Sequence, residues 1–225
     1  KTSEEEWEQK NPQILSSKIA DKALRYDLTV PFARYVVQNR NDLVFPFKRY
    51  QIQPVWRADR PQRGRFREFY QCDADVIGSD SLWQEVELIH IYDGAFTRLG
   101  LPTTIKINNR KILAGMAELL EVSDQFTAFT VAIDKLDKIG LDLVKDEMLQ
   151  KGISDSAIKK VEPILNMEGD AVKKLATMRT VLANSKIGLE GVNEVQTVIN
   201  KVLNLGLESA DLDFDLTLAR GLNYY

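Results

Sequence analysis

The stretch VWRADRPQRGRFREFYQCDADVIG, residues 55–78, joins a dense group of arginines to a pair of carboxylates. Seven basic side chains fall between Lys48 and Arg67, and Asp59 is the one acid among them. Asp73 and Asp75 follow, so the sign of the charge reverses within a few residues. The whole chain has a formal net charge of −3, so the basic cluster is a local feature and is compatible with a local anion site.

Alternation of side chains in this stretch predicts two strands joined by a short loop. The loop RPQRG, residues 60–64, carries the proline and glycine typical of a turn. Strands joined by so short a loop pair antiparallel. One face of the second strand, Phe66 to Val76, is mostly apolar, whereas the opposite face begins at Arg65 and ends at Gln71 and Asp75.

The segments on either side of this hairpin predict an α+β protein. We expect a short strand at 23–28, a helix from Thr29 to about Gln38, an amphipathic helix between the hairpin and Gly100, and a strand at 103–107. Helical periodicity fills about 110–205, and alternation returns at 210–225. We expect breaks between the helical segments at Asp124, Gly140, Gly152, Gly169 and Gly188.

Composition excludes several classes of protein. The 225 residues include one cysteine, Cys72, and one histidine, His90, so neither an intrachain disulfide nor a Cys/His zinc site can form. We find no apolar run long enough to span a membrane and no signal peptide in KTSEEEWEQK. The glycine-rich phosphate loops GxxxxGK[ST] and GxGxxG are also absent. We therefore expect a soluble, cytoplasmic protein.

Simpler explanations exist for the residues that most suggest chemistry. A charged strand face is often just solvated. Cys72 lies on the apolar face of its strand, where we expect a buried, inert thiol. His90 is expected to be structural, and Asp211, Asp213 and Asp215 to form a solvated or partly shielded strand face rather than a magnesium site.

The polar face of the hairpin nevertheless suits a particular reaction. Guanidinium groups bind phosphate through paired hydrogen bonds, and carboxylates bind an ammonium group. A face with arginines at one end and Gln71 and Asp75 at the other can hold a triphosphate beside an amino acid. This arrangement suits attack of a carboxylate on an α-phosphate, which requires positioning and charge neutralisation rather than a covalent nucleophile.

Three stretches, in order, resemble a known family. They are ALRYDLTVPFARY (23–35), RYQIQPVWRADRPQRGRFREFYQCDADVIG (49–78) and LTLARGLNYY (216–225). Together they resemble the catalytic domain of the histidyl-tRNA synthetases, a family of class II aminoacyl-tRNA synthetases. The second stretch resembles the second class II motif, and the third resembles the histidine-specific motif.

The resemblance implies a class II antiparallel sheet flanked by helices, with an all-helical insertion. The catalytic domain would comprise 1–109 and 206–225, and the insertion 110–205. The implied activity joins L-histidine to ATP, giving histidyl-adenylate, and then transfers the histidyl group to histidine tRNA. ATP would bind with Mg²⁺, and no metal would be held by the protein itself. The complete enzyme is expected to be a homodimer that does not associate with membranes.

Roles for individual residues also follow from the resemblance. Arg57 and Arg220 would neutralise the α-phosphate, and Arg65 would contact ATP as well. Arg60, Gln62 and Arg63 would approach the tRNA acceptor end. The histidine-binding set would comprise Asp27, Thr29, Gln71, Asp75, Arg220, Tyr224 and Tyr225.

The sequence also departs from the family pattern. We do not recognise the first class II motif before Asp27, nor the third motif or the anticodon-binding domain after Tyr225. We therefore expect the chain to be part of a longer enzyme. Two alternatives stay open: a histidine-sensing paralogue similar to the regulatory subunit of ATP phosphoribosyltransferase, and a purely structural or interaction fragment. Arg57, Arg65, Arg220 and the RPQRG loop favour the ligase, because a regulator is expected to have lost some of them.

Overall fold

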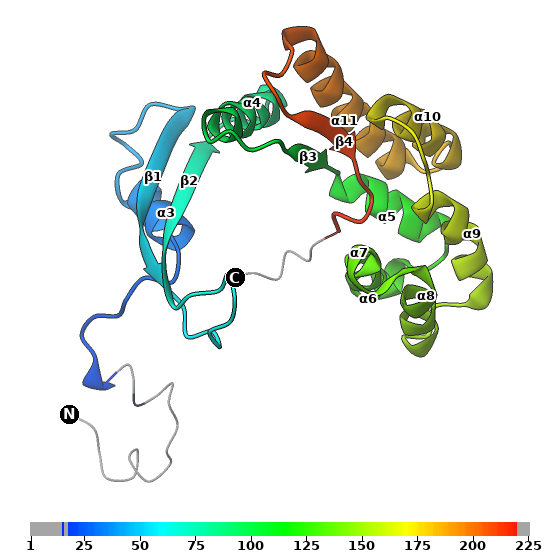
Figure 1. The fold of residues 1–225 in the computed structure, drawn as a ribbon, viewed down its shortest axis with the longest axis horizontal. Coiled ribbons are helices and arrows are strands. Elements are labelled where there is room, and N and C mark those ends of the chain that lie inside the picture. Colours follow the sequence, from blue (N-terminus) through cyan, green and yellow to red (C-terminus); the bar gives the residue numbers. More distant parts are fainter. Residues whose placement is uncertain (1–14, 16–17, 220–225) are drawn as a thin grey trace. The chain divides into compact units, whose positions relative to one another are not determined.

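A computed structural model describes residue 15 and residues 18–219, which divide into two compact units at Ser79 and Asp80. The elements are labelled as in Figure 1. The first unit contains helix α3 (Thr29–Gln38) and strands β1 (Phe47–Trp56) and β2 (Glu68–Ile77). These elements confirm the predicted helix and the predicted hairpin.

Strands β1 and β2 pair antiparallel along their whole length, from Phe47 opposite Ile77 to Trp56 opposite Glu68. The loop between them closes in a tight turn, where the amide of Arg65 donates to the carbonyl of Gln62 at 2.9 Å. Gly64 has a φ of +75°, a conformation that side chains with a Cβ rarely adopt. The RPQRG loop is therefore a turn, as its composition predicts.

The predicted strand at 23–28 is wrong. The segment connects to the hairpin through the backbone hydrogen bond from the amide of Trp56 to the carbonyl of Arg25, at 2.9 Å. The Arg25 side chain makes the neighbouring contact, donating from Nε to the carbonyl of Pro54 at 3.0 Å. The Arg25 side chain thus takes the place of the next backbone–backbone hydrogen bond, so the segment does not form a regular strand beside β1.

The polar face of the hairpin is the covered one, contrary to the apolar pattern of the sequence. Arg49, Gln51 and Gln53 are partly buried, whereas Tyr50 and Ile52 on the other face are 81% and 58% exposed. Cys72 lies on that second face and is exposed, so the prediction of a buried thiol is wrong. Hydrogen bonds between side chains stabilise the covered face. A search for hydrophobic periodicity cannot detect this kind of stabilisation.

The second unit contains mostly helices. Its elements are α4 (Trp83–Arg98), β3 (Thr104–Ile107), α5 (Arg110–Leu119), η1 (Ser123–Gln125), α6 (Phe126–Ile133), α7 (Leu136–Ile139), α8 (Leu141–Gln150), α9 (Asp155–Leu165), α10 (Ala171–Val181), α11 (Lys186–Leu205) and β4 (Asp211–Phe214). Strands β3 and β4 pair in parallel, with Thr104 opposite Asp211. Among the described residues, no helix is both long enough and apolar enough to cross a bilayer.

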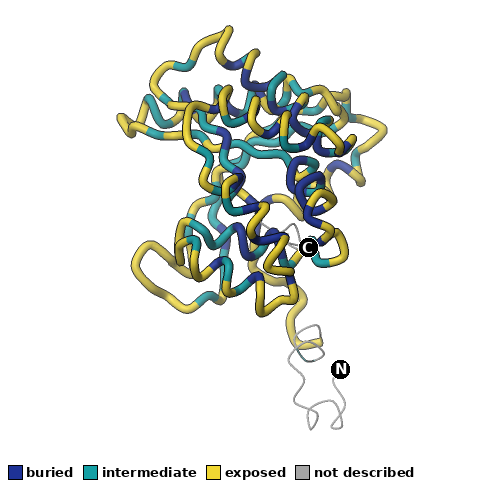
Figure 2. The backbone as a smooth tube through the Cα atoms, turned by 90° about the vertical axis from the view of Figure 1, so that its right-hand side faces the viewer, coloured by how far each residue is buried: buried dark blue, intermediate teal, exposed yellow. Residues whose placement is uncertain are grey.

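Most of the buried apolar residues of the described chain lie in this helical unit. Figure 2 colours all buried positions along the backbone dark blue. Helices α5 and α11 pack closely because glycines line their contact. A Cβ added to Gly115 would lie 2.5 Å from the Cα of Gly188, and one added to Gly191 would lie 2.8 Å from the amide nitrogen of Ile112. Gly188 therefore serves helix packing inside α11, and the break predicted there is wrong; α11 begins after Ser185, whose Oγ caps it.

Asp93 of α4 binds the segment that leads into β4. It is 1% exposed, and its carboxylate accepts hydrogen bonds from the consecutive amides of Glu208, Ser209 and Ala210. These amides immediately precede β4, so the contact fixes the start of that strand against α4. The hydrogen bond from Glu208, with the two others, lowers the pKa of the Asp93 carboxyl. The α+β class is confirmed, although the parallel β3–β4 pair is not foreseen from the sequence.

Candidate active site

The covered face of the hairpin forms a continuous polar network. Because paired residues of an antiparallel sheet share a face, Gln53 lies beside Gln71 and Arg49 beside Asp75. Arg49 Nη1 donates to Gln51 Oε1 at 2.8 Å, and Gln51 Nε2 donates to Gln53 Oε1 at 2.8 Å. The face therefore presents an ordered row of polar groups in place of separate solvated charges.

Asp75 is the carboxylate of this row. Its Oδ2 lies 2.8 Å from Nη2 of Arg49, and the two side chains are 26% and 11% exposed. Burial raises the pKa of the Asp75 carboxyl, Arg49 opposes that rise, and Asp73 adds to it. The sequence suggested arginines at one end of this face and carboxylates at the other, but Arg49 places a cation at the carboxylate end as well.

Gln71 lies four residues nearer the loop than Asp75, on the same face. Its Oε1 atom is buried and accepts no hydrogen bond from the described residues. A buried acceptor without a donor costs about 1–3 kcal/mol, and a ligand that brings an N–H group can recover that cost. This atom is therefore the clearest sign of a binding site on the hairpin.

Asp27 and Thr29 lie at the start of α3, within the same unit. Asp27 is 3% exposed, and its Oδ1 accepts from the amide of Val30 at 3.3 Å, near the N-terminus of the helix. Thr29 is the first residue of α3 and is exposed. Leu28, between them, is connected to the hairpin through its carbonyl, which accepts from Nη2 of Arg49 at 3.2 Å. The structure thus links the Asp27–Thr29 segment with the Asp75 end of the hairpin.

Arg57 lies just beyond the end of β1, where its amide donates to the carbonyl of Arg67 at 2.9 Å. Its guanidinium carbon is 4.5 Å from the ring centroid of Tyr26 and 5.0 Å from that of Phe69. Its Nε donates to the carbonyl of Tyr26 at 3.4 Å. Contact with two aromatic rings fixes the direction of this cation, which suits a group that must meet a phosphate in one orientation.

The loop residues are less constrained. Arg65 donates through Nε and Nη2 to one oxygen of Asp59, at 3.0 and 2.8 Å, and its side chain is 55% exposed. The three candidates for tRNA contact lie in the exposed part of the loop: Arg60, Gln62 and Arg63. Arg220, Tyr224 and Tyr225 lie outside the described residues.

The simpler explanations fit the acidic residues of β4 and its extension. Asp213 accepts from Nζ of Lys174 at 2.8 Å, and Asp215 lies 2.6 Å from Nζ of Lys106. Burial alone would raise the pKa of Asp215, but hydrogen bonds from Lys106 and Thr217 outweigh it and the net change is downward. Among the described residues, no group of three or more His, Cys, Asp or Glu side chains could hold a metal ion.

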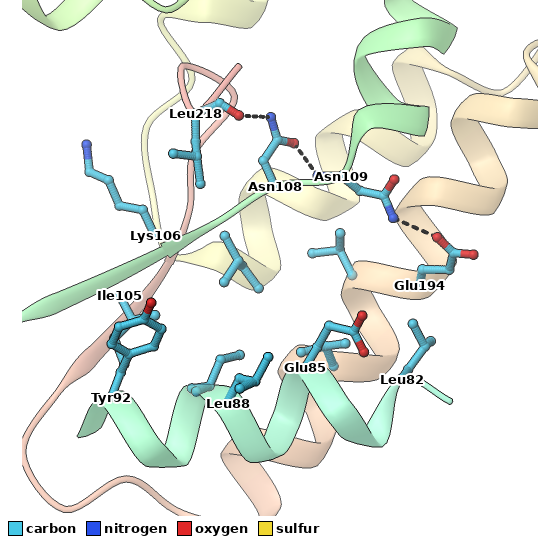
Figure 3. Close-up of a pocket in the computed structure, with 14 residues that line it drawn as sticks. Leu82, Glu85, Leu88, Tyr92, Ile105, Lys106, Asn108, Asn109, Glu194 and Leu218 are labelled. Carbon is cyan, nitrogen blue, oxygen red and sulfur yellow. Dashed lines mark hydrogen bonds between the residues drawn. The ribbon is translucent and has the colours of Figure 1, made fainter. Parts of the chain in front are cut away.

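The second unit holds a cavity of about 390 Å³ between α4, β3 and α11, shown in Figure 3. Its walls are mainly aliphatic, with Leu88, Ile105 and Val198 among them. Several polar groups at its edge bond to one another: Asn109 Nδ2 donates to Glu194 Oε2 at 2.7 Å, and Asn108 Nδ2 donates to the carbonyl of Leu218 at 3.2 Å. The cavity therefore offers few polar groups to a ligand, and the hairpin is the stronger candidate.

Sequence reasoning counted Arg49 in the basic cluster but gave it no role, and it missed Arg25, Tyr26 and Gln53. The register of the hairpin was the signal for Arg49, because it places that residue opposite Asp75. No comparable signal identifies Arg25, whose Nη1 donates to Gln53 Oε1 at 2.6 Å from outside the regular strands.

Comparisons with known proteins show what this chain resembles in sequence and fold. A histidine–tRNA ligase of Flavobacterium johnsoniae is 62% identical over 211 residues, which are 93% of this chain and 44% of that protein. The crystal structure of histidyl-tRNA synthetase from Nostoc sp. PCC 7120 gives a TM-score of 0.80 at 38% identity, covering 90% of this chain and 47% of that one. The chain spans about half the length of the curated relatives it matches.

A more distant structure shares the fold alone. It is described as an ATP phosphoribosyltransferase regulatory subunit/histidyl-tRNA synthetase from Bacillus halodurans C, with a TM-score of 0.73 at 20% identity, over 89% of this chain and 51% of that one. The family model described as histidyl-tRNA synthetase matches residues 18–225, nearly the whole sequence. The chain therefore belongs to the histidyl-tRNA synthetase family.

Proposed function

We propose that this protein is a histidine–tRNA ligase, which activates L-histidine with ATP and Mg²⁺ and then charges histidine tRNA. The names of its close relatives support this activity. The polar face of the hairpin supports the proposal that the reaction takes place there. We also propose a cytoplasmic homodimer, as the family resemblance implies. The catalytic domain is proposed to comprise 1–109 and 206–225, with a helical insertion at 110–205.

The buried, unpartnered Oε1 of Gln71 is the observation that carries this proposal. Histidine offers two kinds of N–H donor, its ammonium group and its imidazole ring. We assign Gln71 and Asp75 to these donors, with Asp27 and Thr29 at the amino group and Tyr224 and Tyr225 at the ring. A carboxylate and an amide carbonyl on one face can hold both ends of a small cationic amino acid while its own carboxylate stays free to react.

In the first step, an oxygen of the histidine carboxylate attacks the α-phosphorus of ATP. The bond between that phosphorus and the bridging oxygen of the pyrophosphate breaks, and pyrophosphate leaves. Negative charge gathers on the α-phosphate oxygens in the transition state, and Arg57 and Arg220 would neutralise it. The stacking of Arg57 on Tyr26 and Phe69 supports its role, because a cation already fixed in direction needs little reorganisation when the charge develops.

ATP would be held further by Arg65, and Mg²⁺ would be bound by phosphate oxygens. For Arg65 to reach a phosphate, its guanidinium must share or leave Asp59, which its exposure allows. In the second step, a hydroxyl of the terminal ribose of the tRNA attacks the carbonyl carbon of the adenylate, and AMP leaves. Arg60, Gln62 and Arg63 are proposed to contact the acceptor end, where an exposed basic loop suits a phosphate backbone.

Charging of tRNA separates the ligase from a histidine-sensing regulator with the same fold. The protein made from the complete open reading frame would be incubated with ATP, radiolabelled histidine and total tRNA, and label in acid-precipitable RNA would be counted. We expect label with histidine tRNA, and none when ATP is left out. Histidine binding by a folded protein without any charging would favour the regulator.

A further inference from the structure

Arg49 has the densest set of contacts in the candidate site, yet none of the proposed roles above belongs to it. Its side chain is 11% exposed, and its guanidinium carbon lies 4.2 Å from the ring centroid of Phe32. Nη2 lies 2.8 Å from Asp75 Oδ2 and 3.2 Å from the carbonyl oxygen of Leu28. Nη1 donates to Gln51 at 2.8 Å. The planar group is therefore fixed on its face and at both of its terminal nitrogens.

The two contacts of Nη2 connect different parts of the proposed histidine site. Leu28 stands between Asp27 and Thr29, and Asp75 lies at the far end of the hairpin face. One nitrogen within hydrogen-bonding distance of both groups keeps them within about 6 Å of each other, about twice a single hydrogen-bond length. A lysine ammonium could replace the charge but not the planar arrangement of donors.

We infer that Arg49 is a positioning residue for histidine binding: its guanidinium, 2.8 Å from Asp75 Oδ2, aligns that carboxylate with the Asp27–Thr29 segment. This inference rests on the proposed function of the site. Arg49 itself need not touch the histidine, because its effect passes through Asp75 and the start of α3.

The charges around Asp75 give this role a measurable signature. Burial raises the pKa of Asp75 and Arg49 opposes the rise, so removal of Arg49 raises that pKa further. Asp73 on the same strand acts in the raising direction. From the other elements, Asp27 precedes α3, and Tyr35 of α3 lines the small cavity beside Arg49. The variant at Arg49 leaves these other side chains in the sequence.

The test is the pH dependence of histidine affinity, measured by isothermal titration calorimetry on the protein from the complete open reading frame. The variant Arg49→Met keeps the aliphatic stem against Phe32 and removes the charge. Because only ionised Asp75 binds the ligand cation well, the ratio of variant to wild-type Kd should grow as the pH falls. We expect the ratio to grow steadily from about pH 8 to about pH 5, toward a limit of about tenfold for each unit by which the pKa of Asp75 rises. Ionisation of free histidine cancels in the ratio.

Two further variants interpret the result. Arg49→Lys should bind histidine more weakly than wild type, but its ratio of variant to wild-type Kd should stay nearly constant across pH. If Arg49→Met does not fold, Arg49→Lys is the variant that tests the inference. Arg34→Met removes an exposed arginine from α3 and should leave the ratio near one. A pH-independent ratio in folded Arg49→Met, or one that rises equally in Arg49→Lys, overturns the role of Arg49. No histidine binding by the wild type would instead refute the proposed function.

Discussion

At the scale of single residues, Gln71 and Asp75 favour a binding site on the hairpin over a merely solvated surface. Both side chains are partly buried, one with an acceptor that lacks a donor and the other as a carboxylate whose pKa burial raises. Each arrangement costs stability in the free protein. Residues that are costly without a ligand and lie four positions apart on one strand face favour a binding role.

Replacing Asp75 by alanine should abolish recognition of histidine. The lost contact is a charged hydrogen bond in a partly buried site, so we expect a loss of at least about 2 kcal/mol, or roughly thirtyfold in Kd. Differential scanning fluorimetry with and without histidine measures the effect as the loss of the ligand-induced rise in Tm. Asp42→Ala, at an exposed position after α3, is the matched control and should keep that rise. Histidine-induced stabilisation that persists in Asp75→Ala would show that the ligand binds elsewhere.

At the scale of elements, each of the two units is stabilised internally by a different kind of interaction. Within the hairpin, side-chain hydrogen bonds and an ion pair link Arg49 to Gln51 and Asp75, and Arg49 also contacts the start of α3 at the Leu28 carbonyl and Phe32. The buried hydrophobic residues described in that unit are Leu28, Val36 and Val55. The helical unit depends on close packing, clearest where Gly115 of α5 meets Gly188 of α11. Substitutions that add volume should therefore act strongly on the helical unit.

Gly115→Ala should destabilise the protein although alanine is the better helix former. Its Cβ would lie 2.5 Å from a backbone atom of Gly188, so the helices must move apart, at a cost of about 1–3 kcal/mol. Gly94→Ala in α4 is the control, because a Cβ there meets nothing within 4 Å, and a gain of up to about 1 kcal/mol is expected. Urea unfolding followed by circular dichroism gives both values. Equal changes in the two variants would contradict the packing account.

At the scale of the whole molecule, local sequence patterns predicted the secondary-structure elements better than they predicted the tertiary contacts. The turn residues and the alternation around Gly64 identified the hairpin, and the apolar periodicity identified the helices. The strand at 23–28 was wrong because Arg25 replaces a backbone pair with a side-chain contact, and the break at Gly188 was wrong because that glycine serves packing. The prediction for Cys72 failed because the hairpin covers its polar face, which depends on a network that period-two alternation does not reveal.

The sequence pattern predicted residues of the candidate site that lie on a regular strand, and did not predict those that lie outside one. Gln71 and Asp75 share a face by strand period alone, and the structure confirms that they do. Asp27 and Thr29 could be named only from family resemblance, since no local rule places the start of one helix beside the end of a distant strand. Arg49 links the two groups in space, and its role becomes visible once the register of the strands is known.

The central claim is that this protein activates histidine. ATP–pyrophosphate exchange, measured on the protein from the complete open reading frame with each of the twenty amino acids in turn, tests it most directly. The exchange reports reversible adenylate formation without tRNA, so it isolates the step assigned to the hairpin. We predict ATP-dependent exchange with histidine and only background exchange with the other nineteen. A folded, histidine-binding protein that shows no exchange with any amino acid would contradict the claim and favour a histidine-sensing regulator.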